Sequence, residues 1–130
     1  MPASTHSLTN IKVRQGSRCI EFAFDNGDVF NLSFEFLRVH SPSAEVKGHG
    51  PGQEILQIGK QNVGIKAINP VGHYAIQIDF DDGHDSGLYS WNYLHELGEN
   101  QDALWQRYLE ALDAAGASRD PEVQVIKLGI

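Results

Sequence analysis

Histidine is the residue type in this chain with the widest chemical range, and six of the 130 residues are histidines. Four of them, His40, His49, His73 and His84, fall in or beside predicted loops, where they could converge. Imidazole binds metals and exchanges protons near neutral pH. No HExxH or HxH pair is present, so local spacing does not define a metal site.

The densest group of candidate residues is the segment RVHSPSAEVKGHGPGQ at positions 38–53. It contains three glycines and two prolines and shows little periodicity. A loop of this length in a small domain is unusual unless it binds something or packs on itself. Ser41 as a cap and Pro42 at the first helical position favour a short helical turn here. The glycine spacing does not match a phosphate-binding loop.

Other reactive residue types show no catalytic pattern. Counted from Asp79, the glycine of the acidic run falls at position 5, whereas a calcium-binding EF-hand loop needs it at position 6. Cys19 lies in a strand pattern, on the face opposite Ile20, and is predicted to be a structural thiol. No GxSxG motif is present. The sequence therefore predicts no catalytic residues.

Short strands must hold these candidates in place. Alternating apolar residues predict strands over 19–24 and 30–34, joined by a tight turn at Asn26-Gly27. Tyr74 is expected to share the inward face of a later strand with Ile76, Ile78 and Phe80. Residues 54–58 and 62–68 are predicted to pair with each other, turning at Gly59-Lys60-Gln61. The remaining predicted strands cover residues 73–80 and 88–89, with residues 123–128 as a last strand or a tail.

The C-terminal third predicts two helices. Ser90 is expected to cap a short helix that ends at Gly98, and Asn100 a longer one that ends at Gly116. These patterns predict an α+β fold, an antiparallel sheet of short strands with the C-terminal helices packed on one face.

The longer helix carries an apolar stripe that includes Trp105 and Tyr108. We expect these two side chains to pack on the sheet face formed by Tyr74, Ile76 and Ile78. The predicted division of the chain is a flexible tail over residues 1–9, one domain over 10–116 and a C-terminal tail over 117–130.

Composition narrows the class of protein. Hydrophobic residues make up 41% of the chain, which is normal for a folded domain. The net charge of −7 argues against DNA or RNA as the main partner. No apolar run could span a bilayer, and the N-terminus lacks the features of a secretory signal. With one cysteine, these features predict a cytoplasmic protein without disulfides.

Long segments of the chain resemble a known family. They are LRVHSPSAEVKGHGPGQ, GKQNVGI and NPVGHYAIQIDFDDGHDSGLYSWNYLHELG, within a resemblance that covers roughly residues 10–112. The chain resembles small bacterial proteins related to the N-terminal domain of gamma-butyrobetaine hydroxylase, a domain of unknown function. Only this accessory domain is similar, because the chain has no HxD motif and no room for the oxygenase barrel.

In the hydroxylases, the resemblance implies a zinc ion held by three cysteines after a Leu-Arg pair and by a histidine further on. Aligned through Leu37-Arg38, the cysteine positions correspond to Ser41, Ser43 and Val46, and the histidine to His84. Serine and valine cannot replace thiolate ligands. We therefore expect no cofactor and do not transfer the family's zinc site.

Relatives of this domain are also fused to iron–sulfur carrier ATPases, which implies an accessory role. We therefore expect a non-catalytic binding module, a protein adaptor associated with metal-cofactor systems such as iron–sulfur carriers or oxygenases. Its expected partner is a protein, not nucleic acid or a membrane. The residues expected to form its binding surface are Arg38, Glu45, His49, Gly50, His73, His84 and Tyr89.

Two alternatives remain open at this point. One is a metal-binding protein, a zinc or iron carrier or a small metal-dependent enzyme, that uses His49, His73 and His84 with Glu45. The other is a homodimer in which the glycine-rich loop forms only the interface.

Overall fold

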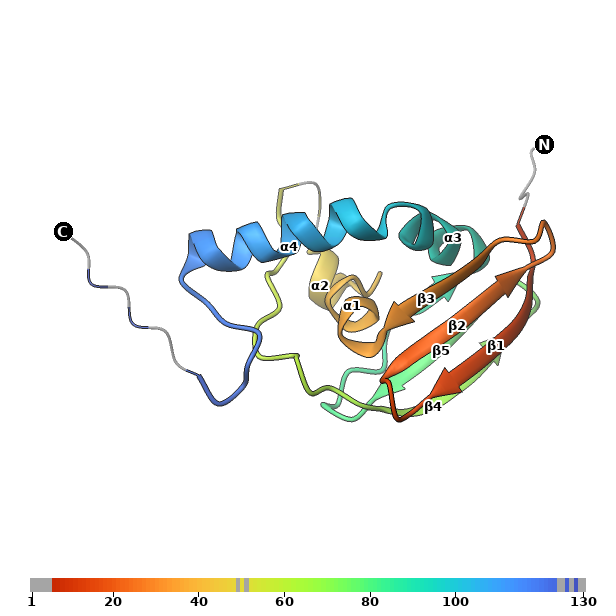
Figure 1. Cartoon of the computed structure of the whole chain (residues 1–130), viewed down its shortest axis with the longest axis horizontal. Helices are drawn as coiled ribbons and strands as arrows, with labels where there is room; N and C mark the ends of the chain where they lie inside the picture. The colour runs from red at the N-terminus through yellow and green to blue at the C-terminus, as the bar shows by residue number, and fades with distance from the viewer. Residues whose placement is uncertain (1–5, 49, 51, 124–125, 127, 129–130) are drawn as a thin grey trace.

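The computed structural model describes residues 6–48, 50, 52–123, 126 and 128. Its strands form two separate antiparallel sheets, and four helices follow or interrupt them within this part of the chain (Figure 1). In chain order the elements are β1 (Leu8–Arg14), β2 (Cys19–Phe24), β3 (Val29–Ser33), α1 (Phe34–Val39), α2 (Ala44–Lys47), β4 (Ile65–Val71), β5 (Ala75–Phe80), β6 (Leu88–Ser90), α3 (Trp91–Glu99) and α4 (Gln101–Ala115).

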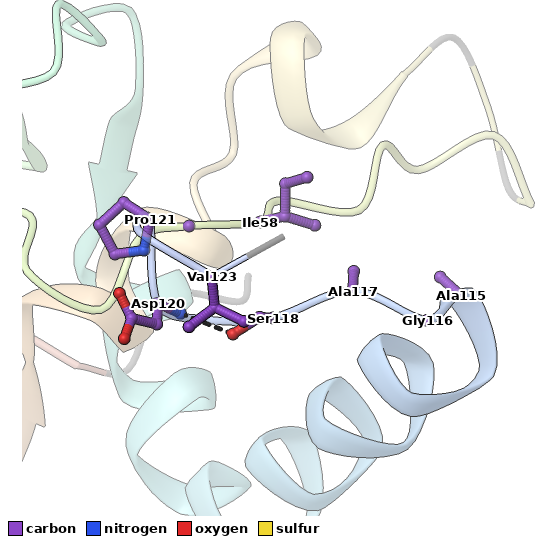
Figure 2. A pocket seen from close by; sticks show the side chains of 9 residues that line it. Ile58, Ala115, Gly116, Ala117, Ser118, Asp120, Pro121 and Val123 are labelled. Carbon is purple, nitrogen blue, oxygen red and sulfur yellow. Dashed lines mark hydrogen bonds between the residues drawn. The ribbon is translucent and has the colours of Figure 1, made fainter. Parts of the chain in front are cut away.

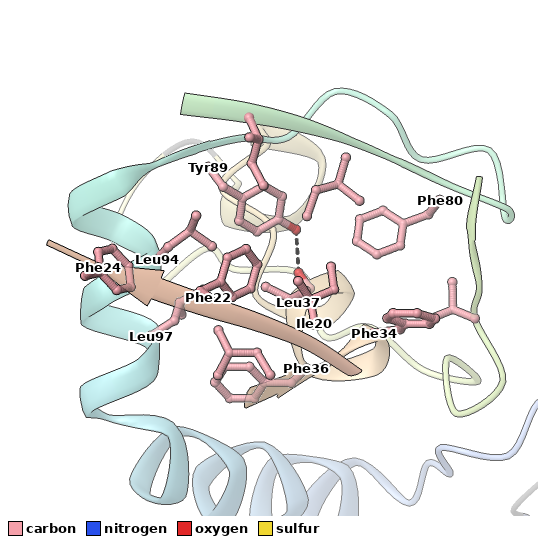
Figure 3. Close-up of a cluster of buried hydrophobic side chains, with 14 residues drawn as sticks. Ile20, Phe22, Phe24, Phe34, Phe36, Leu37, Phe80, Tyr89, Leu94 and Leu97 are labelled. Carbon is pink, nitrogen blue, oxygen red and sulfur yellow. Dashed lines mark hydrogen bonds between the residues drawn. The ribbon is translucent and has the colours of Figure 1, made fainter. Parts of the chain in front are cut away.

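The core lies between the two sheets. The strand orders are β1-β2-β3 and β4-β5-β6, each with antiparallel neighbours. Alternate side chains of the central strands β2 and β5 point into one apolar cluster, which α1 and α3 also enter (Figure 3). The α+β class is confirmed, with two three-stranded sheets in the place of the single sheet that the sequence predicted.

The first predicted hairpin is confirmed, but its second strand is shorter than expected. Gly27 has a φ of 93°, a conformation that favours glycine, and Phe24 N donates to Asp28 O across the turn. β3 stops at Ser33, whose Oγ accepts from Phe36 N at 2.9 Å and caps α1. Phe34, predicted as part of a strand, is instead the first residue of this helix.

The predicted pairing of residues 54–58 with residues 62–68 is wrong. Residues 54–58 form no strand, and β4 begins only at Ile65 and pairs with β5. The connection between the two predicted strands pairs with a different part of the chain. Gly59 N donates to Ser118 O and Gln61 N donates to Arg119 O. This segment therefore runs along the C-terminal chain and forms no hairpin turn.

Tyr74 does not face the core. Its side chain lies outside β5 and the residue is 59% exposed, while both Ala75 and Ile76 are buried. The period-2 alternation holds only within the strand, and Tyr74 belongs to the turn that precedes it, where Gly72 has a φ of 57°.

The two C-terminal helices are confirmed. Ser90 Oγ accepts from Tyr93 N at 3.1 Å and caps α3, which continues through Gly98 to Glu99. Gly98 therefore does not end the helix. A Cβ at Gly98 would overlap the ring of Phe30, so packing against β3 requires glycine there.

The longer helix meets β3 near its start, where Gln101 Nε2 donates to Asn31 O. The predicted contact of Trp105 and Tyr108 with the face of β5 is wrong, because these two side chains pack on α1. Trp105 lies against Phe36 of α1, with ring centroids 6.4 Å apart, and Tyr108 packs with Val39 of α1. α1, which the sequence pattern did not reveal, lies between α4 and the sheets (Figure 1).

Both predicted tails contain ordered contacts within the described residues. β1 begins at Leu8, inside the expected N-terminal tail. At the other end, Arg119 forms a two-pronged ion pair with Glu35 at 2.7 and 2.8 Å. The domain limits themselves stay predictions. Between residues 6 and 123, no helix combines the length and the apolar character needed to cross a bilayer.

Candidate functional site

Two segments that are far apart in the sequence meet at His84. Ser41 Oγ lies 2.8 Å from His84 Nε2, and Glu45 Oε1 lies 2.8 Å from His84 Nδ1. Ser43 Oγ contacts Ser86 Oγ at 2.7 Å beside them. We call these five residues the His84 cluster. It joins the loop around α2 to the turn after β5.

Local backbone chemistry sets the geometry of the cluster. Ser43 caps α2 by accepting from Glu45 N, and its own N–H donates to Ser41 Oγ at 3.2 Å. The sequence predicted the cap of this turn at Ser41, two residues too early. In the segment that follows β5, Gly87 lies next to Ser41 Oγ. A Cβ at this position would overlap that oxygen, so the close approach of the two segments requires glycine.

A network of charged side chains adjoins the His84 cluster and is bonded to it through the His84 backbone amide. Arg38 is buried, and its Nε donates to Asp82 Oδ2 at 2.8 Å while its Nη1 donates to Gln57 Oε1 at 3.0 Å. Lys60 Nζ reaches the same Asp82 oxygen at 2.7 Å, and His84 N donates to the other oxygen. These bonds join α1, the segment 57–60 and the turn after β5.

The network also fixes the charge of Asp82. Burial raises the pKa of its carboxyl, but the hydrogen bonds from Lys60 and the His84 amide and the charge of Arg38 lower it by more. The net pKa lies below its ordinary value, so Asp82 remains ionised beside its two cations.

Tyr89 stands at the inner side of the site as a structural residue. Its ring is fully buried in the core and its hydroxyl donates to Leu37 O (Figure 3). Burial raises the pKa of this phenol, which therefore stays neutral.

The Ser41–His84–Glu45 arrangement has the connectivity of a serine–histidine–acid triad, but it lacks access. The Glu45 carboxylate accepts a hydrogen bond from His84 Nδ1, and the Ser41 hydroxyl is hydrogen-bonded to Nε2 on the other side of the ring. Ser41 is 0% exposed and lines neither of the two larger hollows near the C-terminal helices. A substrate carbonyl cannot reach its oxygen in this arrangement.

The zinc site implied by the resemblance does not fit these residues. The positions of its three cysteines carry two hydroxyls, Ser41 and Ser43, which are hydrogen-bonded to neighbours, and the apolar side chain of Val46. His84 uses both ring nitrogens for hydrogen bonds within the cluster. Nowhere in the described residues do three or more histidine, cysteine or acidic side chains come together in a way that could hold a metal ion.

The structure brings together only part of the predicted binding surface. Arg38, Glu45, His84 and Tyr89 belong to one connected region. His73 does not, because it precedes β5 while His84 follows it, and this six-residue strand separates them by roughly 17 Å at about 3.3 Å per residue.

The remaining predicted residues lie in the glycine-rich loop. Gly50 is partly exposed, and its carbonyl accepts from Gln53 N. His49 lies outside the described residues. His40 turns inward: its Nδ1 donates to Phe36 O at 3.0 Å, and burial lowers the pKa of its ring.

Sequence reasoning missed several members of the site. No role was predicted for Gln57, Lys60 or Ser86. Lys60 and Ser86 lie in segments that carry the family resemblance, but the roles of all three depend on contacts between distant segments. Asp82 belongs to the acidic run of residues 79–85, and it is not among the residues predicted to form the binding surface. Its spacing two residues before His84 is the local signal, because an aspartate carboxylate commonly accepts from the backbone amide two residues on.

A second histidine site was also missed. His95 is buried, and its Nε2 lies 2.7 Å from Asp28 Oδ2 while the ring of His6 stacks on it at 3.7 Å. These contacts join α3 to the β2–β3 turn and to the chain before β1. We regard them as structural, since Phe24 and Phe30 enclose the ring.

Two larger hollows mark the surface near the C-terminal helices. One hollow has a volume of about 540 Å³ and lies where α4 ends and the chain returns past Gly59. Figure 2 shows the side chains that line it. The second, about 570 Å³, lies between α1, α2, the segment 54–57 and α4. Neither includes the His84 cluster itself.

Comparisons with known proteins agree on the family. The family model described as gamma-butyrobetaine hydroxylase-like, N-terminal, matches residues 11–95. One protein with an NMR solution structure is 46% identical, with 98% of this chain and 100% of that chain covered and a TM-score of 0.80. A second protein with an NMR solution structure is 51% identical, with 100% of this chain and 98% of that chain covered and a TM-score of 0.79.

A crystal structure from Acidithiobacillus ferrooxidans is also similar. It is of a protein with unknown function in the DUF971 family, 36% identical, with 71% of this chain and 92% of that chain covered and a TM-score of 0.60. The comparison with curated proteins finds no match.

Proposed function

Because the chain belongs to the gamma-butyrobetaine hydroxylase-like N-terminal domain family, we propose that it is a non-catalytic accessory module that binds a protein partner in the cytoplasm. We further propose that this partner belongs to a metal-cofactor system, such as an iron–sulfur carrier or an oxygenase. The family's separate occurrence beside oxygenase and carrier domains supports this second step.

The observation that carries the proposal is the closed state of the His84 cluster. Ser41 and Ser43 and both nitrogens of His84 are hydrogen-bonded inside the cluster, which leaves no reactive group open to a substrate. The Glu45 side chain is nevertheless 68% exposed. A buried, fully paired polar network that presents an exposed carboxylate is suited to hold a recognition surface in a fixed shape.

Affinity capture tests this function directly. The tagged full chain and its Glu45→Arg variant are used to capture proteins from a lysate of the organism that makes the chain. The control is Asp113→Arg, an exposed acid on α4 away from the cluster. We expect one protein to be enriched by the wild type and the control and lost with Glu45→Arg. No enriched protein, or equal capture by all three, contradicts the proposal.

Metal binding through His49, His73 and His84 is the rival function. The separation of His73 from His84 and the hydrogen bonds on both nitrogens of His84 speak against it. The homodimer is a further rival, and light scattering on the wild type separates a monomer from a dimer without any variant.

A further inference from the structure

We propose that the groove between α1, α2, the segment 54–57 and α4 binds an acidic, apolar peptide segment of the protein partner. This inference rests on the proposed function, because it names the surface and the chemistry by which a partner is recognised. The groove lies beside the His84 cluster, since α2 contributes Glu45 to the cluster and Val46 and Lys47 to the groove.

The walls of the groove are fixed by direct bonds between its elements. Tyr108 Oη on α4 donates to Gln57 O at 2.7 Å, and Ile55 N donates to Val46 O at 2.8 Å. Tyr108 also packs against Val39 at the end of α1. Four separate parts of the chain are therefore held together around the hollow before anything binds, which lowers the entropic cost of binding.

The floor and one rim are apolar. Val39, Val46, Leu56 and Leu104 line the hollow, and Ile55 stands at its edge with 54% of its surface exposed. The volume of about 570 Å³ lies within the range of about 300–1,000 Å³ that is usual for ligand sites. An apolar side chain of a partner would gain by burial against this floor.

The charges at the groove are opposite to those of its surroundings. Residues 79–122 carry eleven acidic and two basic side chains, and the whole chain has a net charge of −7. Yet the groove is lined by two cations, Lys47 and Arg107, and one anion, Glu54. Arg107 is exposed and has no ion pair or hydrogen bond among the described residues. Lys47 Nζ lies over the Tyr93 ring at 4.9 Å, with no carboxylate partner in the same set of residues.

The charges at the groove determine which kind of peptide segment it favours. A segment that combines large apolar side chains with aspartate or glutamate can bury the former on the floor and pair the latter with Arg107 and Lys47. A basic segment would meet two like charges at the rim. The other acidic side chains of residues 79–122 would repel an acidic segment, which favours its docking at Arg107 and Lys47 over the rest of α4.

Peptide selection tests the inference. Short random peptides displayed on phage are selected on the immobilised full chain, and the enriched peptides are then titrated against wild type, Arg107→Glu, Ala111→Trp and the control Lys66→Glu. We expect enrichment of peptides that carry both acidic and large apolar residues. Arg107→Glu should weaken binding by at least about fivefold, Ala111→Trp should abolish it by filling the groove, and Lys66→Glu on β4 should leave it unchanged.

Several outcomes overturn the inference. They are no enrichment, enrichment of basic or uncharged peptides, and equal binding by a folded Ala111→Trp variant, with folding checked by amide NMR spectra. Displacement of the peptides by sodium octanoate at equal concentration would identify a site for small carboxylates instead. A wild-type dimer that Ala111→Trp dissociates would identify a second copy of the chain as the occupant.

The failure of this inference is distinguishable from the failure of the proposed function. If a captured partner binds wild type and Ala111→Trp equally but is lost with Glu45→Arg, the proposed function is supported and the groove is not the site of binding. If no variant captures any partner, the proposed function itself falls.

Discussion

His84 occupies the position of a metal ligand in the family resemblance but serves here as a hydrogen-bonding centre. Its ring joins Ser41 on one side and Glu45 on the other, each at 2.8 Å. These bonds connect the α2 loop to the turn after β5, a connection that a structural metal would otherwise supply. In this structure the connection is made by hydrogen bonds.

Restoring the thiolates should restore metal binding. We expect the triple variant Ser41→Cys, Ser43→Cys, Val46→Cys to bind about one zinc ion per chain, because three thiolates and His84 complete a four-ligand set. Titration with a chromophoric zinc chelator measures the affinity. Adding His84→Ala to the triple variant should weaken zinc binding, and a triple variant without zinc would show that the correspondence of these positions is wrong.

The buried Arg38–Asp82 pair should be essential for stability. Asp82→Asn leaves the Arg38 guanidinium, 8% exposed, without its anionic partner. We expect a loss of about 2–4 kcal/mol in the free energy of unfolding, measured with urea, because an unpaired buried charge is costly. Asp79→Asn on β5, with no ion pair among the described residues, should change it by less than about 0.5 kcal/mol. A loss below about 1 kcal/mol for Asp82→Asn would contradict the role assigned to the pair.

His40 should make stability depend on pH. Burial lowers its pKa in the folded chain below the value of about 6.5 in the unfolded chain. The unfolded state then binds more protons, so the stability contributed by the neutral ring is present above about pH 6.5 and is lost as the pH falls through the lower folded value.

The variant His40→Asn isolates this contribution, since its amide keeps a donor for Phe36 O. We expect the difference in unfolding free energy between wild type and variant to shrink as the pH falls from about 7 to about 5. A difference that stays constant over this range would show that His40 does not titrate differently in the two states.

Among the elements, α1 decides where the longer C-terminal helix packs. Its first residue, Phe34, continues the alternation of β3, and the Ser33 cap marks the point where the strand ends and the helix begins. The sequence could predict the β2–β3 hairpin, α3 and α4, whose signals are local. It could not predict that α4 packs on α1, because that contact depends on a helix too short to show a clear period.

Truncating Trp105 tests this packing. The half-buried indole contacts Phe36 of α1 and lies under the Arg119 guanidinium at 5.0 Å. We expect Trp105→Ala to cost about 2–3 kcal/mol in unfolding free energy, somewhat less than for a fully buried aromatic residue. Arg119→Ala and Trp105→Ala should be non-additive, and a loss below about 1 kcal/mol for Trp105→Ala would show that α4 contributes little to the core.

At the scale of the whole molecule, the polar network lies where four segments of the chain meet. Arg38 comes from α1, Glu45 from α2, His84 from the turn after β5, and Lys60 from the connecting segment. Four of the residues expected to form a binding surface, Arg38, Glu45, His84 and Tyr89, lie in one connected region, and their function at that surface stays a prediction. Composition and motifs could not predict that His73 lies at the far end of β5, since the direction of a strand decides which of its flanking loops meet.

The metal content of the chain purified without a histidine tag tests the central claim most directly. Elemental analysis for zinc and iron is combined with the urea unfolding midpoint before and after dialysis against a chelator. If the His84 cluster is held by hydrogen bonds alone, the preparation contains well below about one ion per ten chains and the midpoint does not change. About one zinc or iron per chain, lost in the His49→Ala, His84→Ala double variant, would contradict it.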